Sequence, residues 1–277
     1  MFIFKKQKDL REFLDGQTGS IGFVPTMGAL HEGHISLLQT SKQSCDLSVC
    51  SIFVNPTQFN DPKDFEKYPV TIDEDIRLLS EAGTDVLFLP DVAEMYPDGL
   101  NGLTAFDIGE LDLILEGQFR PGHFNGVCQI VYRLLTAVRP THLFLGEKDF
   151  QQCMVIQQLM KQTGMDISLI TCPTLREDSG LAKSSRNARL SPEALEKAAL
   201  IYSCLNHIKE KKNEAPFPVL REEAMHILHQ NGFDTEYLEL AESATLRLLD
   251  DFSATQSMIL LIATRLEGVR LIDNLRV

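Results

Sequence analysis

Two histidines in a glycine-containing turn, His31 and His34, are the residues of this 277-residue sequence whose types and spacing most directly suggest chemistry. An apolar run typical of a buried strand (residues 20–24) precedes the turn, and a helical pattern (residues 36–41) follows it. A helix N-terminus after such a turn presents unpaired N–H groups and the positive end of the helix dipole. Histidines three residues apart share one helical face. The stretch therefore predicts an anion site.

Three interpretations of this histidine pair remain open from the residues alone. One histidine could cap the helix while the other lies on the surface. A zinc site is a second possibility, but it needs a third ligand, and no nearby cysteine or glutamate pair completes one. Phosphate binding is the third, with imidazole N–H groups donating to phosphate oxygens. Gly28 and Gly33 favour phosphate, because they leave room for a nucleotide to approach the backbone.

Further polar residues follow other predicted strands. Lys148 comes directly after one strand, where an ammonium could neutralise a polyphosphate, and Asp149 is placed to cap the next helix. A polar loop carries two hydroxyls and a guanidinium, a combination that suits phosphate, although alone it could be any surface loop; its residues are Lys183, Ser184, Ser185 and Arg186. Gln58 and Gln152 are neutral amides that could bind a carboxylate or hydroxyl, or simply be surface glutamines.

The elements that must position these residues alternate between apolar strands and helices. We expect strands at 20–24, 46–54, 85–89, 141–145 and 167–171, and helices at 8–14, 73–82, 127–138 and 150–163. This alternation predicts an α/β fold with a Rossmann-like parallel sheet over residues 1–174. A smaller α+β domain is expected over 175–277, with helices at 192–208 and 219–230 and strands at 235–240 and 258–264. Segments after parallel strands meet at one sheet edge, so the polar residues should converge there.

Composition limits the possible partners. The net charge of −13 argues against non-specific binding to nucleic acid or an anionic membrane. No apolar run approaches the roughly 20 residues of a spanning helix, and the N-terminus lacks the pattern of a secretory signal. The six scattered cysteines are expected to be reduced thiols, none of them catalytic, so we expect a cytoplasmic protein.

Taken in order, the motifs closely resemble those of the pantoate–β-alanine ligase (pantothenate synthetase) family. A His-x-Gly-His turn alone would indicate only the wider superfamily of nucleotidyltransferases, whereas the full series covers essentially the whole chain. The matching segments are Pro25-Thr26-Met27-Gly28-Ala29-Leu30-His31-Glu32-Gly33-His34, Ser51-Ile52-Phe53-Val54-Asn55-Pro56-Thr57-Gln58-Phe59, Leu115-Glu116-Gly117, Arg120-Pro121-Gly122-His123-Phe124, Gly126-Val127, Phe144-Leu145-Gly146-Glu147-Lys148-Asp149-Phe150-Gln151-Gln152, Ser184-Ser185-Arg186-Asn187 and Arg270-Leu271-Ile272-Asp273-Asn274.

The resemblance implies an ATP-dependent condensation of pantoate with β-alanine through a pantoyl adenylate, releasing AMP and pyrophosphate. It implies a magnesium-dependent homodimer, leaves the metal ligands unknown, and gives His34, His31, Lys148 and Arg186 as catalytic residues. The implied pantoate contacts are Gln58, Gln152 and Asn55. The implied ATP site comprises Met27, Gly28, Ala29, Leu30, His31, Glu32, Gly33, His34, Gly146, Glu147, Lys148, Asp149, Leu175, Lys183, Ser184, Ser185 and Arg186.

Two points of chemistry refine this implication. A carboxylate is already ionised at neutral pH, so we expect His34 to stabilise phosphate oxygens rather than to act mainly as a proton donor. Lys183 stands where the family commonly has an apolar residue, and we expect its side chain to face solvent. The alternatives are another nucleotidyltransferase of the His-x-Gly-His type and a catalytically silent nucleotide-binding protein. Paired neutral glutamines argue against a phosphorylated acceptor.

Overall fold

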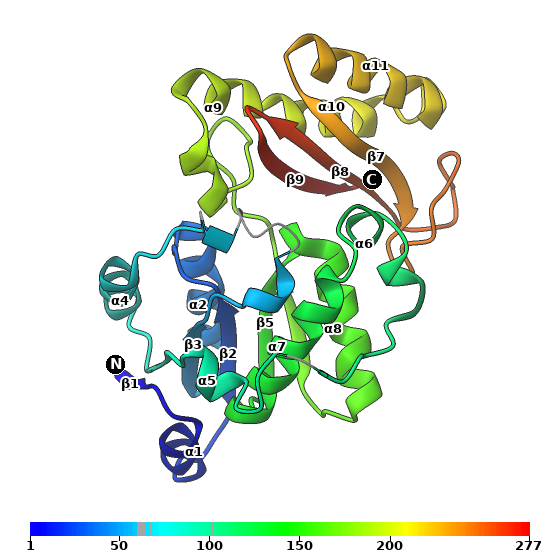
Figure 1. The fold of residues 1–277 in the computed structure, drawn as a ribbon. Coiled ribbons are helices and arrows are strands. Elements are labelled where there is room, and N and C mark those ends of the chain that lie inside the picture. The colour runs from blue at the N-terminus through cyan, green and yellow to red at the C-terminus, as the bar shows by residue number, and fades with distance from the viewer. Residues whose placement is uncertain (60–64, 67, 101) are drawn as a thin grey trace. The chain divides into compact units, whose positions relative to one another are not determined.

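The computed structural model describes residues 1–59, 65–66, 68–100 and 102–277, and the chain divides into two compact units. The first comprises Met1–Glu147 and Gln151–Pro173, and the second comprises Lys148–Phe150 and Thr174–Val277. Figure 1 shows the elements of both. Among the described helices, none combines the length and apolarity that crossing a bilayer requires.

The first unit is built on a six-stranded sheet in the order β1-β4-β3-β2-β5-β6, whose recorded strand pairs are all parallel. Its strands are β1 (Phe2–Phe4), β2 (Ile21–Thr26), β3 (Leu47–Ile52), β4 (Val86–Phe88), β5 (His142–Gly146) and β6 (Ser168–Cys172). The α/β class predicted from sequence is confirmed. The short edge strand β1 was not expected, because three residues are too few to show a periodicity.

Helices cover both faces of this sheet, because successive strand residues point to opposite sides. Phe23, Val49 and Leu143 pack with α1 (Gln7–Asp15), α7 (His123–Val138) and α8 (Phe150–Thr163), whereas Val24 and Cys50 pack with α2 (Glu32–Ser44) and α4 (Ile72–Glu81). The remaining helical segments of the unit are short and come between these elements: η1 (Pro56–Gln58), α5 (Val92–Met95), η2 (Gly109–Asp112), α6 (Glu116–Phe119) and η3 (Glu147–Asp149).

The strand order changes direction between β2 and β5, and ligands of open parallel sheets typically bind at such a point. From β2 the chain builds β3 and β4 on one side, then returns to place β5 and β6 on the other. Loops leaving two adjacent strands in opposite directions open a crevice at the carboxyl end of a parallel sheet. The turn after β2 and the end of β5 at Gly146 flank that point.

The second unit packs three helices against an antiparallel sheet in the order β7-β8-β9. Its elements are η4 (Ser185–Arg189), α9 (Pro192–Ala198), α10 (Leu200–Lys211), α11 (Phe217–Gln230), β7 (Asp234–Glu242), β8 (Met258–Leu266) and β9 (Val269–Arg276). The single helix expected over 192–208 is divided into α9 and α10. The N–H of Ala199 donates to the carbonyls of Glu196 and Lys197, which interrupts the regular helical hydrogen bonds between residues four apart. The third strand, β9, was not among the strands expected from the sequence.

Candidate functional site

The turn after β2 enters α2 earlier than the sequence suggested. The helix begins at Glu32, so His31 is its N-cap and His34 lies in the first turn. His31 Nδ1 accepts the N–H of Gly33 at 3.1 Å, and His34 Nδ1 accepts the N–H of His31 at 3.3 Å. The ring centroids are 4.1 Å apart. The expected helix cap and the expected shared face are thus both present.

These contacts decide which ring nitrogen carries the proton. Because each Nδ1 accepts a backbone N–H, the neutral ring of each histidine is the Nε2–H tautomer. A donor at Nε2 is therefore held on both half-buried rings. Two imidazole donors fixed side by side suit the oxygens of a phosphate.

A buried carboxylate in this turn was not foreseen. Asp75, in the first turn of α4, is fully buried and accepts the N–H groups of Ala29 at 3.0 Å and Leu30 at 2.8 Å. Thr71 donates its hydroxyl to the same carboxylate at 3.2 Å. With the N–H groups of His31, Gly33 and His34 also bonded inside the turn, the expectation of unpaired N–H groups facing a ligand is wrong at these positions. Side chains must therefore supply donors in place of these backbone N–H groups.

The backbone of the turn is tight at Gly28 and Ala29. Gly28 has a φ of +81°, and a Cβ there would lie 2.9 Å from Asp75 Oδ2 and 3.1 Å from Ile52 Cγ2. Ala29 has a φ of +49°, a left-handed conformation that is unfavourable for a residue with a Cβ. The two N–H bonds to Asp75 offset that strain, so the carboxylate shapes the turn.

Next to this turn, Asn55 and Gln58 form an amide cluster with Met27. The fully buried Asn55 donates from Nδ2 to Gln58 Oε1 at 3.1 Å and to the carbonyl of Gly126 at 3.0 Å. Its Oδ1 accepts the Tyr96 hydroxyl at 2.8 Å, and burial raises the pKa of Tyr96, which keeps that donor protonated. Gln58 Nε2 lies 2.8 Å from Met27 Sδ. Asn55 is therefore occupied by protein partners, and Gln58 is the amide it orients.

Helix α7 approaches this cluster without a side chain in between. A Cβ at Gly126 would lie 2.2 Å from the carbonyl oxygen of Thr57, so only glycine permits the contact. His123 Nδ1 lies 2.8 Å from the carbonyl oxygen of Gln58. The motif residues His123 and Gly126, to which the residue types alone assign no role, thus position the segment that carries Gln58.

The two adjacent glutamines of α8 have different surroundings. Gln151 is buried and bridges three backbone groups, accepting from the N–H of Glu116 and donating to the carbonyls of Leu111 and Ile114. Gln152, one residue further, is half-buried. The ligand contact at Gln152 stays a prediction, whereas the Gln151 amide is already bonded to the protein through its nitrogen and its oxygen.

In the second unit, Lys148 is held through its backbone. Asn274 Nδ2 donates to the Lys148 carbonyl oxygen at 2.9 Å. Lys148 and the exposed Asp149 lie in η3 with Glu147, immediately after β5 ends at Gly146. Within the described part of the chain, the Lys148 ammonium has no salt bridge, so it is available to an anion.

The loop before η4 shows one correction. Lys183 Nζ pairs with Glu177 at 2.7 Å and its side chain is only 16% exposed, so the expected solvent-facing side chain is wrong. Ser184 caps η4 by accepting the N–H of Arg186 at 3.3 Å, while Ser185 and Arg186 are half-buried. Leu175 is 38% exposed. An apolar position exposed this far could pack against a flat ring.

Cysteines and metal clusters contribute nothing further in the described residues. The six cysteines form no disulfide among the described residues. Burial raises the pKa of Cys50 and Cys128 to about 12, so these two thiols stay protonated and unreactive. Among the residues described, no three histidine, cysteine or acidic side chains gather as a metal cluster. His31 and His34 each use Nδ1 within the protein, which agrees better with phosphate donation than with zinc.

Taken together, the parallel sheet that changes direction between β2 and β5 and the turn that carries His31 and His34 place the chain among α/β proteins whose ligands bind at such a switch point. The sequence model of the pantoate-beta-alanine ligase family matches residues 2–276. Pantothenate synthetase of Cytophaga hutchinsonii is 47% identical over 92% of this chain and 91% of its own, and that of Bacteroides fragilis is 43% identical over 97% and 96%. The chain belongs to the pantoate–β-alanine ligase family, and its activity is the ligation of pantoate to β-alanine.

Solved structures of this family are similar to the chain over nearly its whole length. Pantothenate synthetase from Thermus thermophilus matches with a TM-score of 0.92 at 38% identity, covering 99% of each chain. The Francisella tularensis ligase, complexed with "beta-gamma ATP" and β-alanine, matches with a TM-score of 0.84 at 37% identity, covering 100% of this chain and 97% of its own. The family therefore uses a nucleotide substrate.

Proposed function

We propose that the chain joins pantoate to β-alanine through a pantoyl adenylate. A carboxylate oxygen of pantoate attacks the α-phosphorus of ATP, the bond to the β-phosphate oxygen breaks, and pyrophosphate leaves. The amine of β-alanine then attacks the acyl carbon, the acyl–phosphate bond breaks, and AMP leaves as the amine loses a proton. The nucleotide in the Francisella tularensis complex supports ATP as the energy source.

The observation that carries this proposal is the pair of Nε2–H donors at the switch point. Negative charge shifts onto the departing pyrophosphate in the first step, so donors fixed in advance lower its barrier. His31 and His34 are fixed through their Nδ1 atoms, and no proton has to leave the already ionised pantoate carboxylate. Both therefore act as phosphate donors, with His34 given no role as a strong acid.

The remaining ATP contacts come from four groups of residues. Lys148 supplies a compact charge to the polyphosphate, and Ser185 and Arg186 supply a hydroxyl and a guanidinium. Lys183 contributes through its backbone carbonyl, since its ammonium pairs with Glu177 and its N–H is bonded to the carbonyl of Leu175. The turn and loop residues that line the nucleotide are Met27, Gly28, Ala29, Leu30, Glu32, Gly33, Gly146, Glu147, Asp149, Leu175 and Ser184.

Pantoate binds through neutral amides. Gln58 and Gln152 recognise its carboxylate and hydroxyl groups, because an amide both donates and accepts. Asn55 acts indirectly, since its Nδ2 and Oδ1 are already bonded inside the protein and Nδ2 orients Gln58.

Magnesium fits the donor chemistry of η3. Mg²⁺ at a nucleotide is commonly held by one or two carboxylates, phosphate oxygens and water, and needs no dedicated protein cluster. Asp149 is an exposed carboxylate next to Lys148 and would hold the ion together with the phosphates. When bound, the ion would neutralise charge on the departing pyrophosphate. We further propose residues 1–174 as the nucleotide- and pantoate-binding domain and 175–277 as the C-terminal domain of a cytoplasmic homodimer.

The decisive experiment follows the carboxylate oxygen. Pantoate labelled with ¹⁸O in its carboxylate is incubated with ATP, Mg²⁺ and β-alanine, and one labelled oxygen is expected in AMP. Without β-alanine, pantoate-dependent exchange of pyrophosphate into ATP is expected, lost on chelation and restored by Mg²⁺. ADP formation, or AMP free of label, would refute the adenylate and favour a different transfer reaction. Sedimentation of the purified protein tests the dimer.

A further inference from the structure

The segment that carries Lys148 is anchored by the last strand of the protein. Lys148–Phe150 lies between β5 and α8 in sequence, but by its contacts it belongs to the second unit. Asn274 donates to the Lys148 carbonyl oxygen at 2.9 Å, and the guanidinium of Arg276 lies 5.1 Å from the centroid of the Phe150 ring. Both ends of the segment are thus held by the end of β9.

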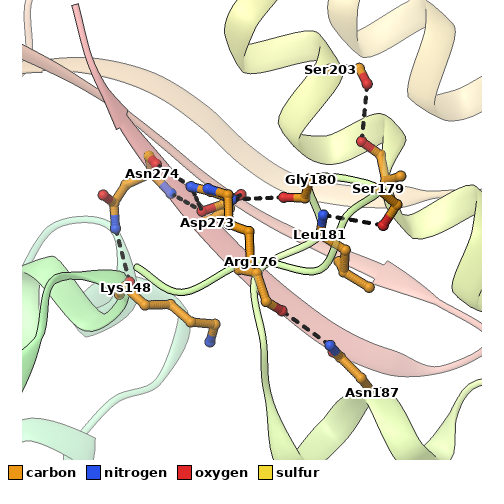
Figure 2. A network of polar contacts seen from close by, with 11 residues as sticks. Lys148, Arg176, Ser179, Gly180, Leu181, Asn187, Ser203, Asp273 and Asn274 are labelled. Atoms are coloured by element: carbon orange, nitrogen blue, oxygen red, sulfur yellow. Dashed lines mark hydrogen bonds and ion pairs between the residues drawn. The ribbon is translucent and has the colours of Figure 1, made fainter. Parts of the chain in front are cut away.

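Asn274 is itself held in a buried network (Figure 2). It is 6% exposed, its N–H donates to Asp273 Oδ1 at 2.8 Å, and its carbonyl accepts from Arg176 Nη2 at 3.3 Å. Asp273 accepts hydrogen bonds from Nη1 and Nη2 of Arg176, at 2.6 and 2.9 Å, and its side chain is only 3% exposed. Arg176 also stacks 3.7 Å from the centroid of the Tyr202 ring. A bidentate, stacked guanidinium is a rigid anchor.

The same arginine also holds the loop before η4. Arg176 Nη1 donates to the carbonyl of Gly180 at 3.1 Å, and its backbone forms an isolated bridge with Ala182. The N–H of Lys183 then bonds to the carbonyl of Leu175 at 2.9 Å. The network of Arg176, Asp273 and Asn274 therefore holds two segments for which we proposed phosphate contacts. These are η3, which carries Lys148, and the loop at 183–186.

We propose that Asn274 is a positioning residue for Lys148, and that Arg176 and Asp273 fix Asn274 in that role. The inference rests on the proposed contact between Lys148 and the polyphosphate. Asn274 holds the Lys148 backbone, and Figure 2 shows the Lys148 side chain extending away from it. A lysine ammonium sits on a flexible four-carbon stem, so the position of its backbone decides where the charge can reach.

A double-mutant cycle separates positioning from mere structural support. Asn274→Ala, Lys148→Ala and the double variant are compared in pantoate-dependent exchange of pyrophosphate into ATP, with kcat and KM for ATP measured separately. We expect Asn274→Ala to lower the exchange rate by roughly 10- to 100-fold, the scale for a misplaced group. In the Lys148→Ala background the same change should lower the rate by less than about twofold, because the group it positions is gone.

A matched control and a second variant keep the test decisive. Asn231 donates to the carbonyl of Ile227 at 2.8 Å in the same unit, so Asn231→Ala removes the same kind of bond and should leave exchange unchanged. Asn274→Asp keeps the shape but loses the donor, and it replaces Asn274→Ala if that variant unfolds; loss of folding in both would overturn the inference. Multiplicative losses in the cycle would also overturn it. A wild-type rate for Lys148→Ala would instead overturn the proposed role of Lys148, and this inference with it.

Discussion

The buried carboxylate of Asp75 gives the sharpest test of how the histidine turn is built. In Asp75→Asn, one oxygen can still accept the N–H of Leu30 and the hydroxyl of Thr71. The new amide, however, faces the N–H of Ala29, where Oδ2 accepted at 3.0 Å. A hydrogen bond to a charged group contributes about 1.5–3 kcal/mol, and an orphaned buried donor costs about 1–3 kcal/mol. Both figures describe the one lost bond, so they overlap rather than add, and we expect a loss of about 1.5–3 kcal/mol in the free energy of unfolding.

Asp75→Asn should lower the catalytic rate as well as the free energy of unfolding. Ala29 keeps its φ of +49° through that bond, so the turn should relax and carry His31 and His34 away from the phosphates. We expect the exchange rate to fall by roughly 10- to 100-fold, measured alongside urea unfolding. Urea unfolding alone would not detect this fall in the exchange rate.

Asp85→Asn is the matched control. Asp85 accepts the N–H and the hydroxyl of Ser48 at 2.8 Å each, at the amino ends of β3 and β4. Asp85→Asn should lower the free energy of unfolding by a comparable amount without a change in KM for ATP. Equal effects of the two substitutions on catalysis, or a wild-type rate in Asp75→Asn, would refute the idea that the carboxylate shapes the site.

Four further predictions concern single groups. His34→Ala should lower turnover by ~10²-fold or more, the scale for a lost transition-state donor, and a near-wild-type rate in steady-state assays would show the role to be misassigned. Gln58→Ala should chiefly raise KM for pantoate; an effect confined to KM for ATP would contradict the amide pocket. Lys183→Leu should change ATP affinity by calorimetry less than about threefold, since its ammonium pairs with Glu177, and a larger change would place that charge at the nucleotide. Because burial raises the pKa of Cys50 from 9.0 to about 12, the neutral thiol is favoured in the folded state. In urea unfolding, Cys50 should make no contribution to the pH dependence of stability below pH 9.0, and stability should fall above that pH. The fall should be weaker in Cys50→Ala.

Several features of the site follow from local sequence. The alternation of apolar runs with helical spacing predicts the parallel sheet, because that period is set by side chains a few residues apart. The residue types near strand ends, such as Lys148 after β5, predict phosphate chemistry before any coordinate is known. The full series of motifs in order also identifies the family.

Tertiary structure decided which polar groups remain for a ligand. Asp75 takes the N–H groups of Ala29 and Leu30 from 46 and 45 positions away, and Asn274 holds Lys148 from 126 positions away. Lys183 was expected to face solvent and instead pairs with Glu177. The sequence by itself determined the chemistry-bearing residues and the strand ends that several of them follow. Only the fold decided which donors are occupied and what positions the rest, because hydrogen-bond partners are chosen by proximity in space and not along the chain.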